Sequence, residues 1–99
     1  MKVRFSTPAF RELSEILDHL SAHSSMGARQ VAARIRTMAG QLGRQPFSGV
    51  ETEVPGIRRL TTVPYPYLLF YEVHATEIVI VAIRHGARDP GILPSKRTP

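Results

Sequence analysis

The chain has 99 residues, of which 42% are hydrophobic and 21% are charged. This length suits one domain, and the composition excludes a disordered chain and a long coiled coil. The 13 basic and 8 acidic residues give a formal charge of +5, which favours an acidic partner. The absence of cysteine excludes disulfides, thiol nucleophiles and thiolate metal ligands. Because no apolar run is long enough for a signal peptide or a membrane span, we expect a cytoplasmic protein without a membrane partner.

The first half of the chain predicts a short strand followed by two helices. Polar and apolar residues alternate over residues 2–6, as in a strand with one buried face. Thr7 has the properties of a helix N-cap, and apolar residues then recur at helical spacing as far as Leu20. After a short polar break, a second apolar stripe covers residues 28–42, with Gly43 as the expected C-terminal cap. The short connection favours an antiparallel helical hairpin.

The second half of the chain predicts three strands. Residues 45–56 contain two prolines and two glycines with little periodicity, so we interpret them as a loop. The segments that follow are rich in β-branched, aromatic and aliphatic residues, and they are residues 57–63, 67–73 and 77–85. Their short connections require antiparallel hairpins. The order β-α-α-β-β-β therefore predicts an α+β fold, in which a helical hairpin packs on a mainly antiparallel four-stranded sheet.

We expect a single domain over residues 1–90. Residues 91–99 follow a proline, contain two more and show no period, which is typical of an irregular C-terminal tail.

The end of the last predicted strand is the most distinctive place in the sequence. Two guanidiniums, an imidazole and a carboxylate occur within six residues, namely those of Arg84, His85, Arg88 and Asp89. In one interpretation this segment carries the activity, with an imidazole that titrates near neutral pH or orients an RNA hydroxyl. In the other, the arginines and the aspartate pair to fix the turn, and His85 stacks on Tyr65 or Tyr67. The residues alone do not separate the two.

Arg58 and Arg59 open another predicted strand, and alternation sends their side chains to opposite faces. Only one of them can therefore face a given ligand. The alternative for either arginine is a solvated side chain, or an ion pair with Glu72 or Glu77 across the sheet.

His19 and His23 are four residues apart, with Glu15 one turn earlier. This spacing is compatible with a metal clip, but the sequence has no zinc-protease motif and the first helix is expected to end near residue 21. We therefore interpret these residues as surface residues and expect neither a metal nor a cofactor.

The element order and three segments together resemble the RelE/ParE superfamily of small toxins from type II toxin-antitoxin pairs, and in particular its ParE branch. The segments are residues 5–16 (FSTPAFRELSEI), 57–73 (IRRLTTVPYPYLLFYEV) and 78–90 (IVIVAIRHGARDP). The likeness covers most of residues 3–90, and the last segment is the most specific of the three.

The resemblance implies a toxin that is neutralised by a cognate, acidic, ParD-like antitoxin, with which it forms a hetero-oligomer. ParE-like members are described as inhibitors of DNA gyrase, so this branch implies growth arrest and plasmid stabilisation without catalysis. RelE-like members are ribosome-dependent mRNA endonucleases. They use basic side chains on the middle strands, and an arginine with a tyrosine or histidine near the C-terminus.

Carried over by position, the resemblance pairs Arg58 and Arg59 with the basic residues of the second strand and Arg88 with the C-terminal arginine. Leu68 stands where an arginine is expected on the third strand, and the C-terminal tyrosine or histidine is missing. These departures favour ParE-like action on gyrase. The candidates for that activity are Arg84, His85, Arg88 and Asp89. The alternative is ribosome-dependent cleavage by Arg58, Arg59, His85 and Arg88.

The antitoxin is expected on the helical hairpin and the adjoining sheet edge, since antitoxins of this type end in an acidic segment that folds onto the toxin. The second helix and its exit, residues 25–44, hold four arginines and no acid. Leu13 and Leu17 are the candidates for apolar contact, and Arg29, Arg34 and Arg36 are those for salt bridges. The alternative for these arginines is a solvated helix face.

Overall fold

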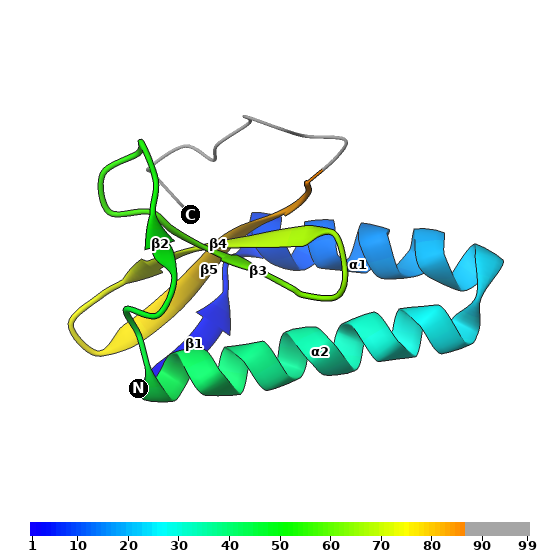
Figure 1. Cartoon of the computed structure of the whole chain (residues 1–99), viewed down its shortest axis with the longest axis horizontal. Helices are drawn as coiled ribbons and strands as arrows, with labels where there is room; N and C mark the ends of the chain where they lie inside the picture. The colour runs from blue at the N-terminus through cyan, green and yellow to red at the C-terminus, as the bar shows by residue number, and fades with distance from the viewer. Residues whose placement is uncertain (87–99) are drawn as a thin grey trace.

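Two helices lie on one face of a five-stranded mixed sheet in the computed structural model, which describes residues 1–86 (Figure 1). The helices are α1 (Thr7–His23) and α2 (Ser25–Arg44). The strands are β1 (Lys2–Phe5), β2 (Val50–Glu51), β3 (Arg58–Thr61), β4 (Tyr67–Val73) and β5 (Glu77–His85). The α+β class and the packing of the hairpin on the sheet are confirmed. The expected domain boundary at residue 90 and the tail lie outside the described residues.

The strands are ordered β1-β5-β4-β3-β2, and all pairs are antiparallel except β1 with β5. The sheet thus has five strands rather than the expected four. The additional strand β2 lies within the segment interpreted as a loop, where Val50 pairs with Arg59 and Glu51 with Arg58. A strand of two residues is too short to produce a visible alternation in the sequence, and its pairing partner alone defines it.

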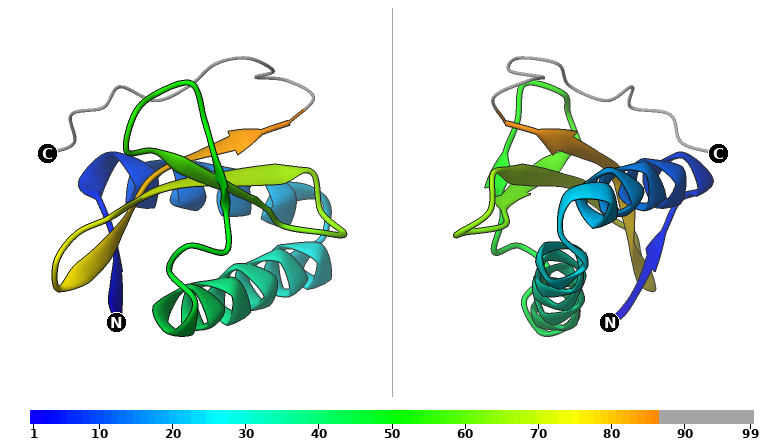
Figure 2. Two further views of the ribbon diagram at one scale, coloured as in Figure 1. Left: turned by 60° about the vertical axis from the view of Figure 1, so that its left-hand side comes forward. Right: turned by 90° about the vertical axis from the view of Figure 1, so that its right-hand side faces the viewer.

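The helix hairpin is tighter than expected, because the only residue between α1 and α2 is Ser24. Its hydroxyl accepts a hydrogen bond from the amide of Gly27 (3.0 Å), which caps α2. The right-hand view in Figure 2 shows the two helices side by side on one side of the sheet. The polar residues near the hairpin are therefore helical, and the break that was expected over several residues is a single capping residue.

The cap of α1 is Ser6, and not Thr7, which already lies within the helix. The Ser6 hydroxyl accepts from the amide of Ala9 (3.2 Å), while the Ser6 amide donates to the carbonyl of Ile80 on β5 (2.9 Å). Ser6 is only 1% exposed. One buried serine therefore starts the helix and also ties the junction between β1 and α1 to the central strand.

Gly43 is not the C-terminal cap of α2, because the helix continues to Arg44 and Gln45 caps it through a bond to the Gln41 carbonyl. The glycine has a different use. A Cβ atom at this position would lie 2.7 Å from the carbonyl oxygen of Met1, so only glycine lets the start of the chain approach α2 this closely. The terminal amine of Met1 donates to the Gly43 carbonyl (2.8 Å).

Both faces of β4 and β5 are buried. On the helix side, the sheet residues of the core are Tyr67, Leu69, Tyr71, Ile78, Ile80 and Ile83. On the other side, Phe70, Val79 and Val81 pack with Ile57, and Val54 contributes from the loop after β2. The last strand is therefore covered on both faces, which places the ends of β4 and β5 on a rigid support.

The double role of Ser6 gives a stability prediction. Replacing it in Ser6→Ala removes the acceptor for the Ala9 amide inside the protein, so the free energy of unfolding should fall by about 1–2 kcal/mol. Urea unfolding followed by circular dichroism measures this loss. The matched control is Ser24→Ala, which removes the exposed cap of α2 and should cost no more than about 1 kcal/mol. Alanine keeps the backbone bond from Ser6 to Ile80, so the comparison tests the hydroxyl alone, and equal losses in the two variants would contradict a larger contribution from the buried cap.

Candidate functional site

The end of β5 brings Arg84 and His85 next to α1. β1 pairs with β5 only as far as Ile80, so the later residues of β5 have an open edge on that side. Glu12 of α1 occupies this edge. One of its carboxylate oxygens accepts from the amide of Ile83 (3.0 Å), and the other accepts from the Arg84 guanidinium. Arg84 is thereby fixed against the helix.

The next two residues are held from the other side. The rings of His85 and Tyr67 meet edge to face with centroids 5.4 Å apart, and the amide of Gly86 donates to the Pro66 carbonyl (2.7 Å). Of the two stacking partners proposed for His85, the structure thus shows Tyr67. Among the described residues, Arg84 pairs with Glu12 of α1, and the expected pairing of an arginine with Asp89 stays a prediction. Arg88 and Asp89 lie outside the described residues.

A cavity of about 370 Å³ lies beside these groups. Its walls include the side chains of Glu12, Ile16, Tyr67, Ile83, Arg84 and His85. We call this group of residues, together with Gly86, the β5 exit. It combines a fixed guanidinium, an imidazole and an apolar wall in one concave place, which suits the recognition of a partner side chain.

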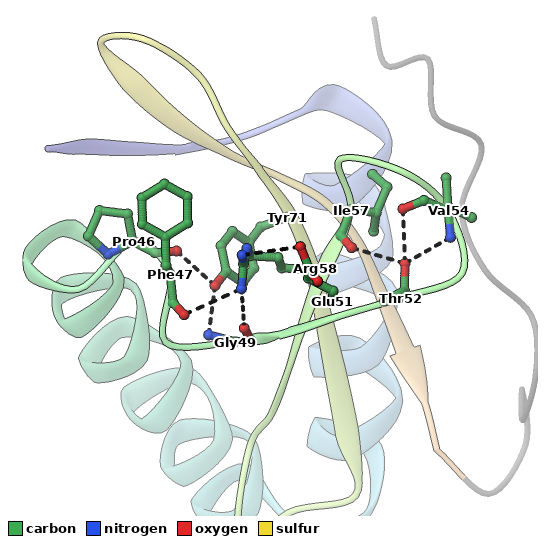
Figure 3. Close-up of polar contacts among 9 residues, drawn as sticks. All are labelled: Pro46, Phe47, Gly49, Glu51, Thr52, Val54, Ile57, Arg58 and Tyr71. Carbon is green, nitrogen blue, oxygen red and sulfur yellow. Dashed lines mark hydrogen bonds and ion pairs between the residues drawn. The ribbon is translucent and has the colours of Figure 1, made fainter.

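Arg58 lies at the opposite part of the sheet and holds a loop. Its guanidinium donates to the carbonyl of Gly49 (2.8 Å) and more weakly to that of Phe47 (3.4 Å). The same group lies over the Phe47 ring, 5.0 Å from the centroid, and 3.5 Å from a carboxylate oxygen of Glu51 (Figure 3). Most of its donors are therefore directed at the segment between α2 and β3.

The ion pairs that were expected for Arg58 and Arg59 do not form. Glu72 contacts His74 (3.0 Å) and Glu77 contacts Arg4 (3.0 Å). Arg59 is exposed, which matches the solvated alternative, and the side chains of the two arginines are unequally buried, as strand alternation predicts.

Of the described candidates for RNA cleavage, Arg58 and His85 are not brought together. Arg58 lies opposite Tyr71 on β4, and His85 lies opposite Tyr67 on the same strand. These two positions are four residues apart, or about 13 Å along the strand. Leu68, where an arginine is expected for this chemistry, is half-buried on β4 and lies across from Arg84.

Tyr71 was missed as an organising residue, because its pattern is that of any core residue of a strand. It is 0% exposed, and its hydroxyl donates to the carbonyl of Pro46 (2.9 Å) and accepts from the amide of Gly49 (2.9 Å) (Figure 3). A Cβ atom on Gly49 would lie 2.6 Å from that hydroxyl. The buried phenol therefore sets the path of the chain from α2 to β2.

Glu12 was also missed, since on the sequence it is one of several acids off the apolar stripe of the first helix. No local signal separates it from Glu15, which has no ion pair among the described residues. Only the position of the helix relative to the open edge of β5 selects Glu12.

The residues predicted to contact an antitoxin lie on the hairpin. Leu13 and Leu17 are half-buried against the core, whereas Arg29 and Arg36 are exposed on α2. Arg34 is half-buried and donates to the carbonyl of Val63 (2.8 Å), so part of its guanidinium is already used.

His19 and His23 contact each other edge to face at 5.2 Å, and no set of three metal-binding side chains forms within residues 1–86. In the same range, no helix is both long and apolar enough to cross a membrane.

Comparison with known proteins gives the same family by sequence and by structure. The family described as ParE toxin of the type II toxin-antitoxin system parDE matches residues 3–90. Toxin RelE2 of Caulobacter vibrioides is 35% identical over 80 residues, which cover 81% of this chain and 89% of that protein. A solved structure titled as the chromosomal ParDE TA system from P. aeruginosa superposes with a TM-score of 0.76 at 26% identity, covering 86% of this chain and 95% of that one.

The hydroxyl of Tyr71 leads to a second prediction. Tyr71→Phe leaves the Gly49 amide and the Pro46 carbonyl without their partner, so the free energy of unfolding should fall by about 2 kcal/mol. Hydrogen exchange at the Gly49 amide should become faster in the same variant. Tyr65→Phe is the control, because the Tyr65 hydroxyl has no hydrogen bond among residues 1–86, and its stability should be nearly unchanged. A Tyr71→Phe protein as stable as the control would show that the loop holds its own path.

Proposed function

The chain belongs to the ParE toxin family of type II toxin-antitoxin systems, and from that membership we propose that it arrests growth by inhibiting DNA gyrase, without catalysis of its own. The proposal places the toxic surface at the β5 exit, with Arg84 and His85 as the contact residues, continued by Arg88 and Asp89. The observation that supports it best is that Glu12 and Tyr67 hold these two side chains beside a cavity. A fixed cation and an aromatic neighbour are the kind of anchor on which protein interfaces depend.

Ribosome-dependent mRNA cleavage is the alternative, and the geometry gives it less support. Of its proposed residues, Arg58 is engaged with the carbonyls of the 47–49 segment, and His85 lies about 13 Å further along the sheet. Cleavage of a phosphodiester needs several groups around one phosphate, and each contributes several kcal/mol to the transition state. Leu68 stands where this chemistry is expected to use an arginine on the strand, and its side chain supplies no charge for the phosphate.

We further propose that a cognate ParD-like antitoxin neutralises the toxin by binding the helical hairpin in a hetero-oligomer. Residues 25–44 carry four arginines and no acid, so an acidic segment laid over α2 meets an uncompensated positive surface. Arg29 and Arg36 project into solvent there, Arg34 borders them, and Leu13 and Leu17 supply apolar surface on α1. Gyrase and an antitoxin encoded beside the toxin both act in the cytoplasm, which is where we place the protein.

The gyrase proposal is tested by expressing the toxin from an inducible promoter, with the antitoxin under separate control. Induction should arrest growth, co-expression of the antitoxin should restore it, and purified toxin should inhibit supercoiling by gyrase. Arg84→Ala with His85→Ala should lower the inhibition at least tenfold while the protein stays folded. Growth arrest without an effect on supercoiling would exclude gyrase, and new 3′ ends in translated mRNA would support the ribosomal alternative.

The antitoxin proposal predicts a charge-dependent affinity. Arg36→Glu should weaken binding of the antitoxin roughly fivefold at low salt, because it replaces an attraction with a repulsion. The difference from the wild type should shrink as the salt concentration rises. Titration calorimetry at two salt concentrations measures both effects. Lys2→Glu makes the same charge change at an exposed position on β1, and an equal loss in that control would mean that net charge alone governs the affinity.

A further inference from the structure

The carboxylate of Glu12 makes two different contacts with successive residues of β5. One oxygen accepts from the backbone amide of Ile83 (3.0 Å), and the other accepts from the guanidinium of Arg84. The backbone contact fixes the carboxylate relative to the strand. The orientation of the carboxylate therefore determines where the guanidinium of the next residue lies.

This ion pair is more enclosed than the other arginine-carboxylate pair on β5. The side chains of Arg84 and Glu12 are 20% and 29% exposed, whereas those of Arg4 and Glu77 are 48% and 31% exposed. Partial burial reduces screening by solvent and salt, so the Glu12 contact holds its partner more firmly. Glu12 thus restricts a long side chain that would otherwise sample many rotamers.

Arg84 nevertheless keeps donors for a partner. A guanidinium has five N–H groups, and the contact with Glu12 is made through one of its terminal nitrogens. Within residues 1–86 the guanidinium has no other partner, and it lines the cavity at the β5 exit. The contact therefore orients the group without using it up.

We propose that Glu12 is the positioning residue of the toxic surface, which holds the Arg84 guanidinium in the orientation that the target recognises. This inference rests on the location of toxicity proposed above. Glu12 also lines the β5 exit, and the role assigned to it here is exerted through Arg84. A target that meets an ordered guanidinium avoids the entropic cost of ordering it, and affinity rises accordingly.

The central variant is Glu12→Gln, whose amide oxygen can still accept from the Ile83 amide but no longer carries the charge that holds Arg84. We expect roughly tenfold more toxin to be needed for the same growth arrest, and the Nε–H signal of Arg84 in the NMR spectrum to move to the position of a free arginine. Binding of the antitoxin on the hairpin should stay unchanged. Glu77→Gln, which breaks the exposed pair with Arg4 at the other end of β5, is the matched control and should keep full toxicity.

A charge exchange separates positioning from simple stabilisation. The double variant Glu12→Arg with Arg84→Glu restores an ion pair but moves the guanidinium from the strand to the helix. An arginine side chain cannot accept from the Ile83 amide, so stability in urea should recover only in part; if Glu12 positions Arg84 for the target, growth arrest should stay weak. Recovery of both would mean that the pair only stabilises the fold, and would overturn the proposal. This variant also serves if Glu12→Gln folds poorly.

The remaining outcomes distinguish this inference from the proposed function. Full toxicity of Glu12→Gln together with loss of toxicity in Arg84→Ala would overturn the positioning role alone. A Glu12→Gln toxin more potent than the wild type would also overturn it, because Glu12 would then mask the guanidinium. Full toxicity of Arg84→Ala would overturn the proposed toxic surface. Growth arrest without gyrase inhibition would exclude gyrase as the target. The effect of Glu12→Gln on toxicity would still be measured, because growth arrest is read independently of supercoiling.

Discussion

The open edge of β5 is the constraint from which the rest of the structure follows. β5 is the longest strand within residues 1–86, but β1 covers its outer edge only as far as Ile80, and the backbone groups beyond it need partners other than β1. The start of α1 provides them. Ser6 donates to Ile80 through its amide, and nearly two turns further along the chain Glu12 accepts from Ile83. The helix is thus attached to the sheet by the bonds that a longer first strand would have made.

The attachment of α1 to the open edge of β5 places helix side chains on the surface at the end of the strand. A neighbouring strand would have placed only backbone beside the end of β5, whereas a helix places side chains there. The carboxylate that completes the edge is the same group that binds the guanidinium of Arg84. The same carboxylate therefore completes the edge of β5 and orients the Arg84 guanidinium, and a substitution at Glu12 changes both contacts.

The distribution of ion pairs explains where the positive charge of the molecule is available. In residues 1–86, acids neutralise arginines on the sheet and at its ends, at Arg4, Arg58 and Arg84. No acid pairs with the arginines of α2, and Arg29 and Arg36 point into solvent. Among the described residues, exposed arginines without an acidic partner therefore gather on α2, which the antitoxin is proposed to cover. At the β5 exit, the described residues contribute one guanidinium, that of Arg84, which Glu12 orients, so the two proposed interfaces differ in kind and can be altered separately.

How far the sequence predicts the molecule depends on the range of the interaction concerned. β4 and β5 have the bounds expected from their apolar runs, because burial on both faces leaves a signal in every residue. The cap of α1 was misplaced by one residue, since Ser6 and Thr7 have equivalent hydroxyls and only the contact of Ser6 with β5 distinguishes them. An ion pair with Glu72 or Glu77 was one alternative for Arg58, but the Tyr71 hydroxyl fixes the loop after α2, and the Arg58 guanidinium binds backbone carbonyls of that loop and pairs with Glu51 of β2. The side chains that organise the site owe their roles to contacts with elements distant in sequence. The local pattern of residues around each side chain does not show which distant element it contacts.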